Sequence, residues 1–242
     1  MTDIDKSIRK NTLEALAKSF HEEGRRYGLK HVDYVRFVGV LLDVTLKSEM
    51  GARSAAASGK GYQNLGKNSG TAAFPLQGNL VSVVPFEAEN HVPLLQSWVD
   101  DAVGRNFLIS RSSASRYPLE TLIDHPGTVL GMITPAGEST PVGAVAFLNI
   151  DKPNRRAELR KIIGVPGSRR GGYAREAAQL WLDYGWRGLA LHKVYLSTLQ
   201  INLPNIELNR ELGFSVEGVL KDEVFYDNTF HDVLRMSMFA PD

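Results

Sequence analysis

A glycine-rich turn between a strand-like run and an amphipathic helix constrains this chain more than any other feature. The run Ala157 to Gly164 precedes the turn, which reads Arg169-Arg170-Gly171-Gly172-Tyr173-Ala174, and the helix begins near Gly172. The first turn of a helix carries backbone N–H groups without intrahelical partners, and the helix dipole adds positive charge there. Glycines let a phosphate approach that backbone, and the arginines add charge at its rim. The turn therefore predicts a binding site for a phosphate or diphosphate.

The elements around this turn follow an order that indicates a mixed α/β sheet. After the turn, residues 192–200 alternate as a strand does, and Asn202 opens a short helix that Gly213 ends as a C-terminal cap. Two β-rich runs then form a hairpin across Asp227-Asn228. Before the turn, we expect strands at 80–84, 129–134, 142–150 and 157–163, a helix capped by Asn90, and a short helix at 118–124.

Residues 78–242 resemble the GNAT family of acyl-CoA-dependent N-acyltransferases. The branch that looks most similar is that of the ribosomal-protein-alanine N-acetyltransferases, with relatives that act on antibiotics, amino sugars and polyamines. The matching motifs are Ala157-Glu158-Leu159, Ile163-Gly164, Arg169 to Ala174, Glu176-Ala177, Asn202, Leu212-Gly213-Phe214, Glu217-Gly218 and His231-Asp232-Val233. The resemblance implies an α/β (α+β) fold, with a mixed, mostly antiparallel and twisted sheet flanked by helices.

The resemblance also implies acetyl-CoA as the acyl donor and a place for it. The strand that ends at Gly164 would splay from the strand that begins near Lys193, and the pantetheine arm would lie between them. Backbone groups near Ile163, Gly164 and Val165 would pair with that arm. The diphosphate would bind to Arg169, Arg170, Gly171, Gly172, Tyr173 and Ala174. Asn202 would lie beside the arm, with a simple helix N-cap as the alternative role.

In the reaction that the resemblance implies, a primary amine attacks the thioester directly. A neutral amine is needed, so a base or a water relay must remove a proton. Glu158 is the candidate catalytic residue for this step, and the alternative is that Glu158 only pairs with Arg160. The oxyanion would be bound by a backbone amide within residues 163–165.

One position departs from the family pattern. Most relatives have a tyrosine four residues before the glycine of Leu-Gly-Phe, and here that residue is Asn209. An amide cannot deliver a proton as a phenol can, although it can hydrogen-bond to the sulfur or to the CoA arm. The proton donor to the leaving thiolate is therefore open between water, Ser197, Tyr226 and an N-terminal group.

The amine acceptor is also open, between a peptide N-terminus and a small molecule. Arg160 and Lys161 either recognise an acidic acceptor or are structural charges. Acidic residues of the penultimate strand could line an acceptor pocket, namely Glu217, Asp222 and Glu223, and His231 is a candidate for its rim. His231 and Asp232 do not form a dyad, because adjacent strand residues point to opposite faces.

The N-terminal third has a different organisation. Residues 1–50 form a helical extension, with helices expected at 4–28 and 34–46, and residues 51–77 are a Gly/Ala/Ser-rich linker before the acyltransferase domain at 78–242. The second helix is apolar on two sides. Three roles of the helical extension are open. It packs on its own acyltransferase domain, it forms a homodimer or docks a partner, or it delivers substrate.

Composition excludes several other classes of protein. The chain has no cysteine, so disulfides, thiolate metal sites and cysteine nucleophiles are excluded, and a net charge of +1 argues against a dedicated nucleic-acid binder. Scattered histidines indicate no metal site, and the absence of a long apolar run indicates a cytoplasmic protein without a membrane partner. We expect an N-acetyltransferase. The alternative is a non-catalytic or carrier-protein-linked module that acts through the N-terminal helices.

Overall fold

The computed structural model describes residues 3–51, 74–100, 119–226 and 228–241. It divides into two compact units, Met1–Ala55 and Ala56–Asp242. Within the described residues, no helix is both long enough and apolar enough to cross a bilayer.

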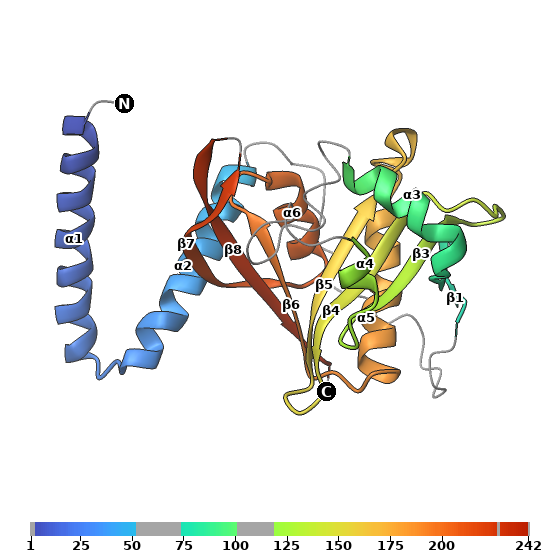
Figure 1. Cartoon of the computed structure of the whole chain (residues 1–242). Coiled ribbons are helices and arrows are strands. Elements are labelled where there is room, and N and C mark those ends of the chain that lie inside the picture. Colours follow the sequence, from blue (N-terminus) through green and yellow to red (C-terminus); the bar gives the residue numbers. More distant parts are fainter. Residues whose placement is uncertain (1–2, 52–73, 101–118, 227, 242) are drawn as a thin grey trace. The chain divides into compact units, whose positions relative to one another are not determined.

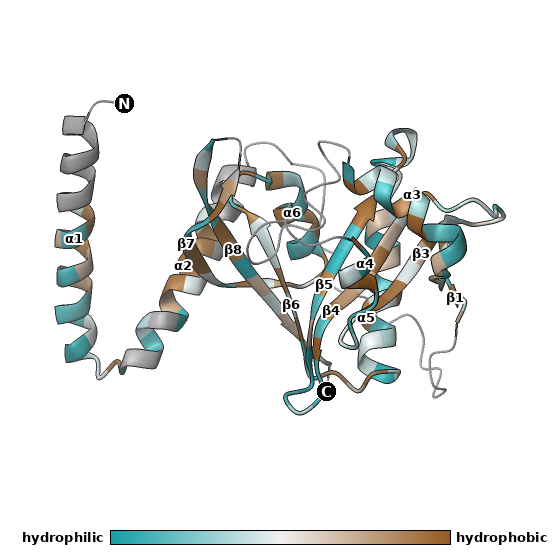
Figure 2. Cartoon of the chain, viewed as in Figure 1, coloured by the Kyte–Doolittle hydropathy of each residue, from teal (hydrophilic) through white to brown (hydrophobic). Residues whose placement is uncertain are grey.

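The first unit is a pair of helices, α1 (Asp3–Arg26) and α2 (His31–Gly51). The ring of Phe20 stacks on that of Phe37 with centroids 4.2 Å apart, and the Tyr34 hydroxyl donates to the backbone oxygen of His21 at 2.9 Å. The apolar character of α2 is visible in Figure 2, and several of its large side chains are exposed within this unit: Val38, Val40, Leu41 and Val44. The predicted helices are thus confirmed, and their docking role stays a prediction.

The second unit is built on an eight-stranded sheet with the order β1-β2-β3-β4-β5-β6-β8-β7. Its strands are β1 (Leu76–Gln77), β2 (Val81–Pro85), β3 (Val129–Pro135), β4 (Gly143–Asp151), β5 (Arg156–Ile163), β6 (Lys193–Leu199), β7 (Ser215–Tyr226) and β8 (Thr229–Phe239). All neighbours are antiparallel except β5 and β6, which confirms the mixed, mostly antiparallel sheet. Strand β1 occupies the end of the predicted linker, and residues 52–73 of that linker lie outside the described residues.

Helices cover both faces of the β2–β5 half of the sheet (Figure 1). They are α3 (Ala88–Asp100), α4 (Leu119–Ile123) and α5 (Tyr173–Arg187), while α6 (Leu203–Glu211) follows β6. On one face, Trp181 of α5 stacks on Phe147 of β4 with centroids 5.5 Å apart. On the other, Trp98 of α3 packs in a cluster with Met132 and Ala146. Alternating strand residues thus supply two cores from one sheet.

Helix α3 begins earlier than the sequence predicted. It starts at Ala88, so Asn90 lies inside the helix and is not its cap. The Asn90 side chain instead donates to the Glu87 carboxylate at 2.9 Å. Side chains of this kind compete for several local partners, which is why a cap position is hard to fix from sequence.

The two parallel strands separate after a short contact. Only three residue pairs join them, between Arg156–Glu158 of β5 and Lys193–Tyr195 of β6. Both strands continue beyond that point, and each stays paired on its other side, β5 with β4 and β6 with β8. The result is the expected splay, which is visible in Figure 1 as the divergence of β5 and β6.

A single carboxylate fastens the first turn of α5 to the start of β2. Glu176 accepts hydrogen bonds from the backbone amides of Asn79, Leu80 and Val81 at 2.9, 2.6 and 2.8 Å. Charge-assisted bonds of this kind are stronger than neutral ones. The beginning of α5, and with it the glycine-rich turn, is therefore held against the sheet.

Tight packing at the end of β5 gives a matched pair of substitutions. A Cβ atom on Gly164 would lie 2.0 Å from the Trp98 ring, whereas a Cβ atom on Gly167 would meet nothing within 4 Å. We expect Gly164→Ala to lower the free energy of unfolding by about 1–3 kcal/mol through overpacking. Gly167→Ala should change it by less than about 0.5 kcal/mol, as surface substitutions do. Urea unfolding of both variants checks this, and equal losses would contradict the packing argument.

Candidate active site

The glycine-rich turn has the backbone geometry of an anion-binding loop. After a 3₁₀ turn at Pro166–Ser168, Arg170 and Gly172 adopt left-handed φ values of 71° and 83°, with Gly171 between them. Changes of handedness of this kind point successive N–H groups into one concavity. The amides of residues 170–174 have no backbone acceptor among the described residues, and Arg170, Gly171 and Gly172 are exposed. The turn can therefore receive a phosphate without displacing an internal hydrogen bond.

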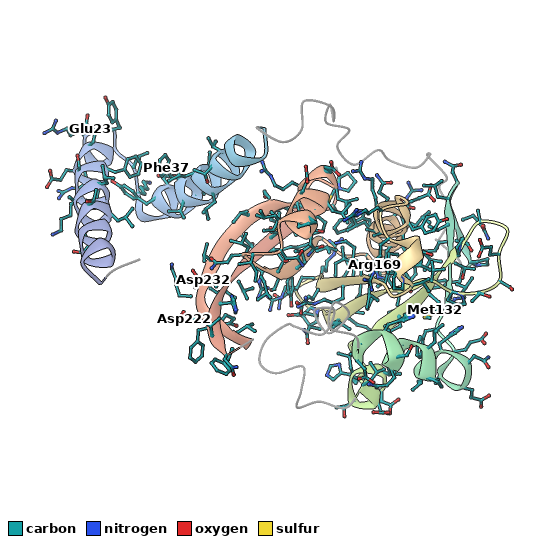
Figure 3. The ribbon with its side chains drawn as sticks, turned by 90° about the horizontal axis from the view of Figure 1, so that it is seen from above. Glu23, Phe37, Met132, Arg169, Asp222 and Asp232 are labelled. Carbon is teal, nitrogen blue, oxygen red and sulfur yellow. The ribbon has the colours of Figure 1, made fainter. Side chains whose placement is uncertain are left out.

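The two arginines of the turn differ in what they contact. Arg169 folds back over the end of β5, where Nε donates to the Ile163 carbonyl at 3.1 Å and Nη2 donates to the Gly164 carbonyl at 3.3 Å (Figure 3). Arg170 is exposed. Arg169 thus shapes the turn, and Arg170 is the arginine whose charge is available to a ligand.

Two of the three backbone amides predicted to face the pantetheine arm already donate hydrogen bonds within the protein. The amides of Gly164 and Val165 both donate to the Val142 carbonyl, at 2.9 and 3.2 Å. Because bonding directions alternate along an antiparallel strand, the Ile163 N–H points away from β4, toward the opening. Of residues 163–165, Ile163 therefore offers the free amide.

A cavity occupies the opening between β5 and β6. Three asparagines of α6 and its cap share one face of the helix and line this cavity, as their spacing of three and four residues predicts. The lining residues are Leu159, Arg160, Lys161, Leu196, Ser197, Thr198, Leu199, Asn202, Asn205 and Asn209. Asn202 is the N-cap of α6, since its side chain accepts from the Asn205 amide, and Asn205 in turn donates to the Thr198 hydroxyl at 3.1 Å. Asn202 and Asn209 were predicted from the sequence as site residues, whereas Asn205 was not, although the same helical spacing connects all three.

Lys161 and Asn209 meet across this cavity. The Lys161 Nζ donates to Asn209 Oδ1 at 2.5 Å, from β5 to α6. Asn209 is fully buried, and its Nδ2 has no acceptor among the described residues. Burial, together with the positive charge of Arg160, lowers the pKa of Lys161 to about 7. An ammonium with this pKa gives up its proton far more readily than an ordinary lysine does.

Glu158 and Arg160 form a buried ion pair where the two strands begin to separate. The Arg160 Nη2 lies 2.6 Å from Glu158 Oε1, and their side chains are 6% and 2% exposed. Asn149 donates to the other carboxylate oxygen at 2.9 Å, and Arg160 Nη1 donates to the Ser197 carbonyl at 3.0 Å. Burial lowers the pKa of Arg160, and the Glu158 charge opposes this shift. Arg160 therefore has a structural role that the sequence analysis left open.

The predicted role of Glu158 as general base requires that an amine or a water reach this buried carboxylate. A general base must lie within hydrogen-bond reach of the proton that it takes, directly or through one water. The printed contacts of this carboxylate include those to Arg160 and Asn149, which fix its orientation. The role of Glu158 stays a prediction.

The hairpin of β7 and β8 carries an irregularity that Asp232 holds in place. Between Leu220 and Val224 the register shifts, and Asp222 adopts a left-handed φ of 49°. The Asp232 carboxylate accepts from the Asp222 amide at 3.0 Å and from Lys221 Nζ at 3.1 Å, and Figure 3 shows Asp222 and Asp232 close together. Of the acidic residues predicted to line an acceptor pocket, Asp222 and Glu223 are exposed here, while Glu217 is paired with Lys193.

Asp232 should make the stability of this hairpin depend on pH. The Asp222 amide, with a smaller contribution from Lys221, holds the pKa of Asp232 below its usual value. A lowered pKa stabilises the fold above the unfolded value of about 3.9, and the effect is lost as the pH falls through the folded value. We expect Asp232→Asn to cost about 1–2 kcal/mol at pH 7. Urea unfolding at pH 7 and pH 3 checks this, and a difference that persists undiminished at pH 3 would rule it out.

The sequence and the fold have counterparts among known proteins. The family model for the acetyltransferase (GNAT) domain matches residues 82–215, which are 134 of the 242 residues. Spermidine N(1)-acetyltransferase of Escherichia coli K12 is 40% identical over 97 residues, which cover 40% of this chain and 52% of that enzyme. The chain thus spans about half the length of the curated relatives that it matches.

Solved structures agree with the family match. The crystal structure of spermidine N-acetyltransferase from Vibrio cholerae in complex with CoA and spermine has a TM-score of 0.57 and 26% identity, and the match covers 66% of this chain and 95% of that one. A dodecameric structure of the Vibrio cholerae enzyme has a TM-score of 0.54 and 25% identity, and covers 66% and 94%. These relatives carry the names of spermidine acetyltransferases, so they do not support the finer expectation of the ribosomal-protein-alanine branch. With a family model matched over more than half of its length, the chain belongs to the GNAT acetyltransferase family.

Proposed function

We propose that the protein transfers an acetyl group from acetyl-CoA to a primary amine of a small molecule. One observation carries this proposal: the amides of residues 170–174, which have no backbone acceptor among the described residues, belong to the turn that follows β5, the strand that separates from β6 beside the cavity. A diphosphate site beside an opening lined by polar side chains fits a ligand with a charged end and a reactive arm.

The residues present fit the donor in three places. The amides of residues 170–174 and the exposed Arg170 would hold the diphosphate. The Ile163 amide would pair with the pantetheine arm or with the oxyanion. The thioester would reach the cavity where Asn202 and Asn209 lie. Bound there, acetyl-CoA supplies an activated acyl carbon to the incoming amine.

The amine acceptor that we propose is a polyamine. Support comes from the relatives, whose names are those of spermidine acetyltransferases, one of them solved with CoA and spermine. Further support comes from the exposed carboxylates Asp222 and Glu223 on the β7–β8 hairpin, since opposite charge attracts a cationic substrate. The amino group of a peptide N-terminus carries a single positive charge, so its electrostatic attraction to these two carboxylates is weaker.

Glu158 is the base that we propose for the amine, through a relay, with its carboxylate fixed by Arg160 and Asn149. We also propose that the chain self-associates, because one similar enzyme is described as a dodecamer and α2 exposes apolar side chains within its own unit. The cytoplasmic location stays a prediction.

A direct acceptor comparison tests the proposed function. The purified chain is incubated with acetyl-CoA and either spermidine, spermine or a peptide that begins with alanine. With the polyamines we expect release of the free thiol of CoA. Mass spectrometry should show a product about 42 Da heavier than the acceptor, because one acetyl group replaces one hydrogen. The kcat/KM for spermidine should exceed that for the peptide at least about tenfold, which corresponds to about 1.4 kcal/mol. Faster acetylation of the peptide would refute the polyamine assignment. Binding of CoA without any transfer would favour a non-catalytic module.

A charge-reversal pair tests the donor site separately. We expect Arg170→Glu to weaken CoA binding about five- to twentyfold, because the variant replaces an attraction to the diphosphate by a repulsion near the turn. Lys152→Glu, an equal change at an exposed residue of the β4–β5 connection, is the control. Isothermal titration with CoA measures both, and equal affinities of the two variants would place the diphosphate elsewhere.

A further inference from the structure

The position where most relatives place a proton-donating tyrosine is linked here to a lysine. Asn209 occupies that position, and Lys161 reaches it from β5 by a hydrogen bond of 2.5 Å. Both side chains line the cavity in the opening between β5 and β6. A charged lysine has three N–H donors and one is used by Asn209, so further N–H groups of Lys161 remain for a ligand.

We infer that Lys161 is the proton donor to the leaving sulfur, and that Asn209 is the positioning residue that orients it. This assignment rests on the proposed acetyl transfer. The general acid of the reaction then comes from β5, whereas a tyrosine at position 209 would have supplied it from α6.

The step balances as follows. The amine nitrogen forms a bond to the acyl carbon and loses one proton to the base or its water. The bond from that carbon to sulfur breaks, and the electron pair stays on sulfur. One proton moves from Lys161 Nζ to that sulfur, which leaves as the free thiol of CoA. Lys161 then regains a proton from solvent.

The surroundings of Lys161 favour proton donation. Arg160 is the charged neighbour that acts on it, and Arg160 is paired with Glu158. From α6, the lysine faces the neutral amide of Asn209, and no carboxylate lies in an ion pair with it among the described residues. The lowered pKa of about 7 lies close to the pH at which an acid of this kind works best.

Two of the other donors considered from the sequence, Ser197 and Tyr226, are less suited to this step than Lys161. Ser197 is buried, and a neutral serine hydroxyl is a weaker proton donor than a charged ammonium. Tyr226 pairs with Thr229 at the tip of the β7–β8 hairpin, and its side chain lies outside the described residues. The purely structural alternative is that the Lys161–Asn209 bond only ties β5 to α6, and the experiment must separate that role from catalysis.

The kinetic test uses the full chain with acetyl-CoA and the best acceptor found. We expect Lys161→Met to lower kcat about 100-fold or more, while CoA affinity changes less than threefold. The alkaline limb of the rate profile, where wild-type kcat falls as the pH rises past about 7 and Lys161 loses its proton, should disappear. Adding Asn209→Tyr to Lys161→Met should restore kcat at least tenfold. Lys152→Met is the matched control on an exposed lysine.

A second readout does not depend on activity. In protein labelled with ¹³C-lysine, the Lys161 Cε resonance is assigned by its absence from the spectrum of Lys161→Met. We expect this resonance to titrate near pH 7 and to shift when CoA binds. Thermal unfolding shows whether each variant is folded. If Lys161→Met does not fold, Lys161→Gln is used in its place.

The outcomes separate the two proposals. Wild-type transfer with a Lys161→Met kcat within threefold of wild type would overturn the assignment of Lys161 alone. A Lys161 resonance that titrates above pH 10 and does not shift when CoA is added would also overturn this assignment. A wild-type chain that binds CoA but acetylates no amine would overturn the proposed function, and the assignment of Lys161 with it.

Discussion

The short parallel contact between β5 and β6 is the constraint on which the rest of the site depends. Three residue pairs join the strands, and beyond Glu158 and Tyr195 each strand keeps only its outer partner. Parallel neighbours that diverge leave backbone groups of β5 without a ladder, and the Ile163 amide is one of them. The same divergence makes room for α6 to bring Asn205 and Asn209 over the opening. The cavity is thus a consequence of sheet topology rather than of a separate loop.

Buried charge secures the point from which the strands separate. Glu158 and Arg160 form an ion pair inside the sheet, and Arg160 also donates to the Ser197 carbonyl of β6. A buried pair of this kind compensates for lost hydration only when its remaining hydrogen-bonding groups are satisfied, and Asn149 supplies part of that compensation. The position of Lys161 follows from this arrangement, because alternation along β5 sends Lys161 to the face opposite Arg160.

Much of this architecture could be predicted from local patterns. The glycine-rich turn, the strand before it and the helix after it are consecutive in sequence, so their chemistry is readable without tertiary information. Gly213, with a φ of 102°, ends α6 as its glycine predicts. By contrast, Asn90 as a helix cap was wrong, and β1 lies within a segment predicted as linker. Two-residue strands and cap positions depend on partners far along the chain, which local propensity does not contain.

The sequence by itself determined the family, the order of most elements and the position of the glycine-rich turn, because each of these depends on motifs of neighbouring residues. Only the tertiary structure decided the roles of individual charges. Arg169 and Arg170 are adjacent and chemically identical, yet one is bound to the carbonyls of Ile163 and Gly164 while the other is exposed. Lys161 and Asn209 are 48 residues apart and meet only because β5 and α6 flank the same opening. Burial and long-range contacts fix what a charged side chain does, and neither is encoded in local spacing.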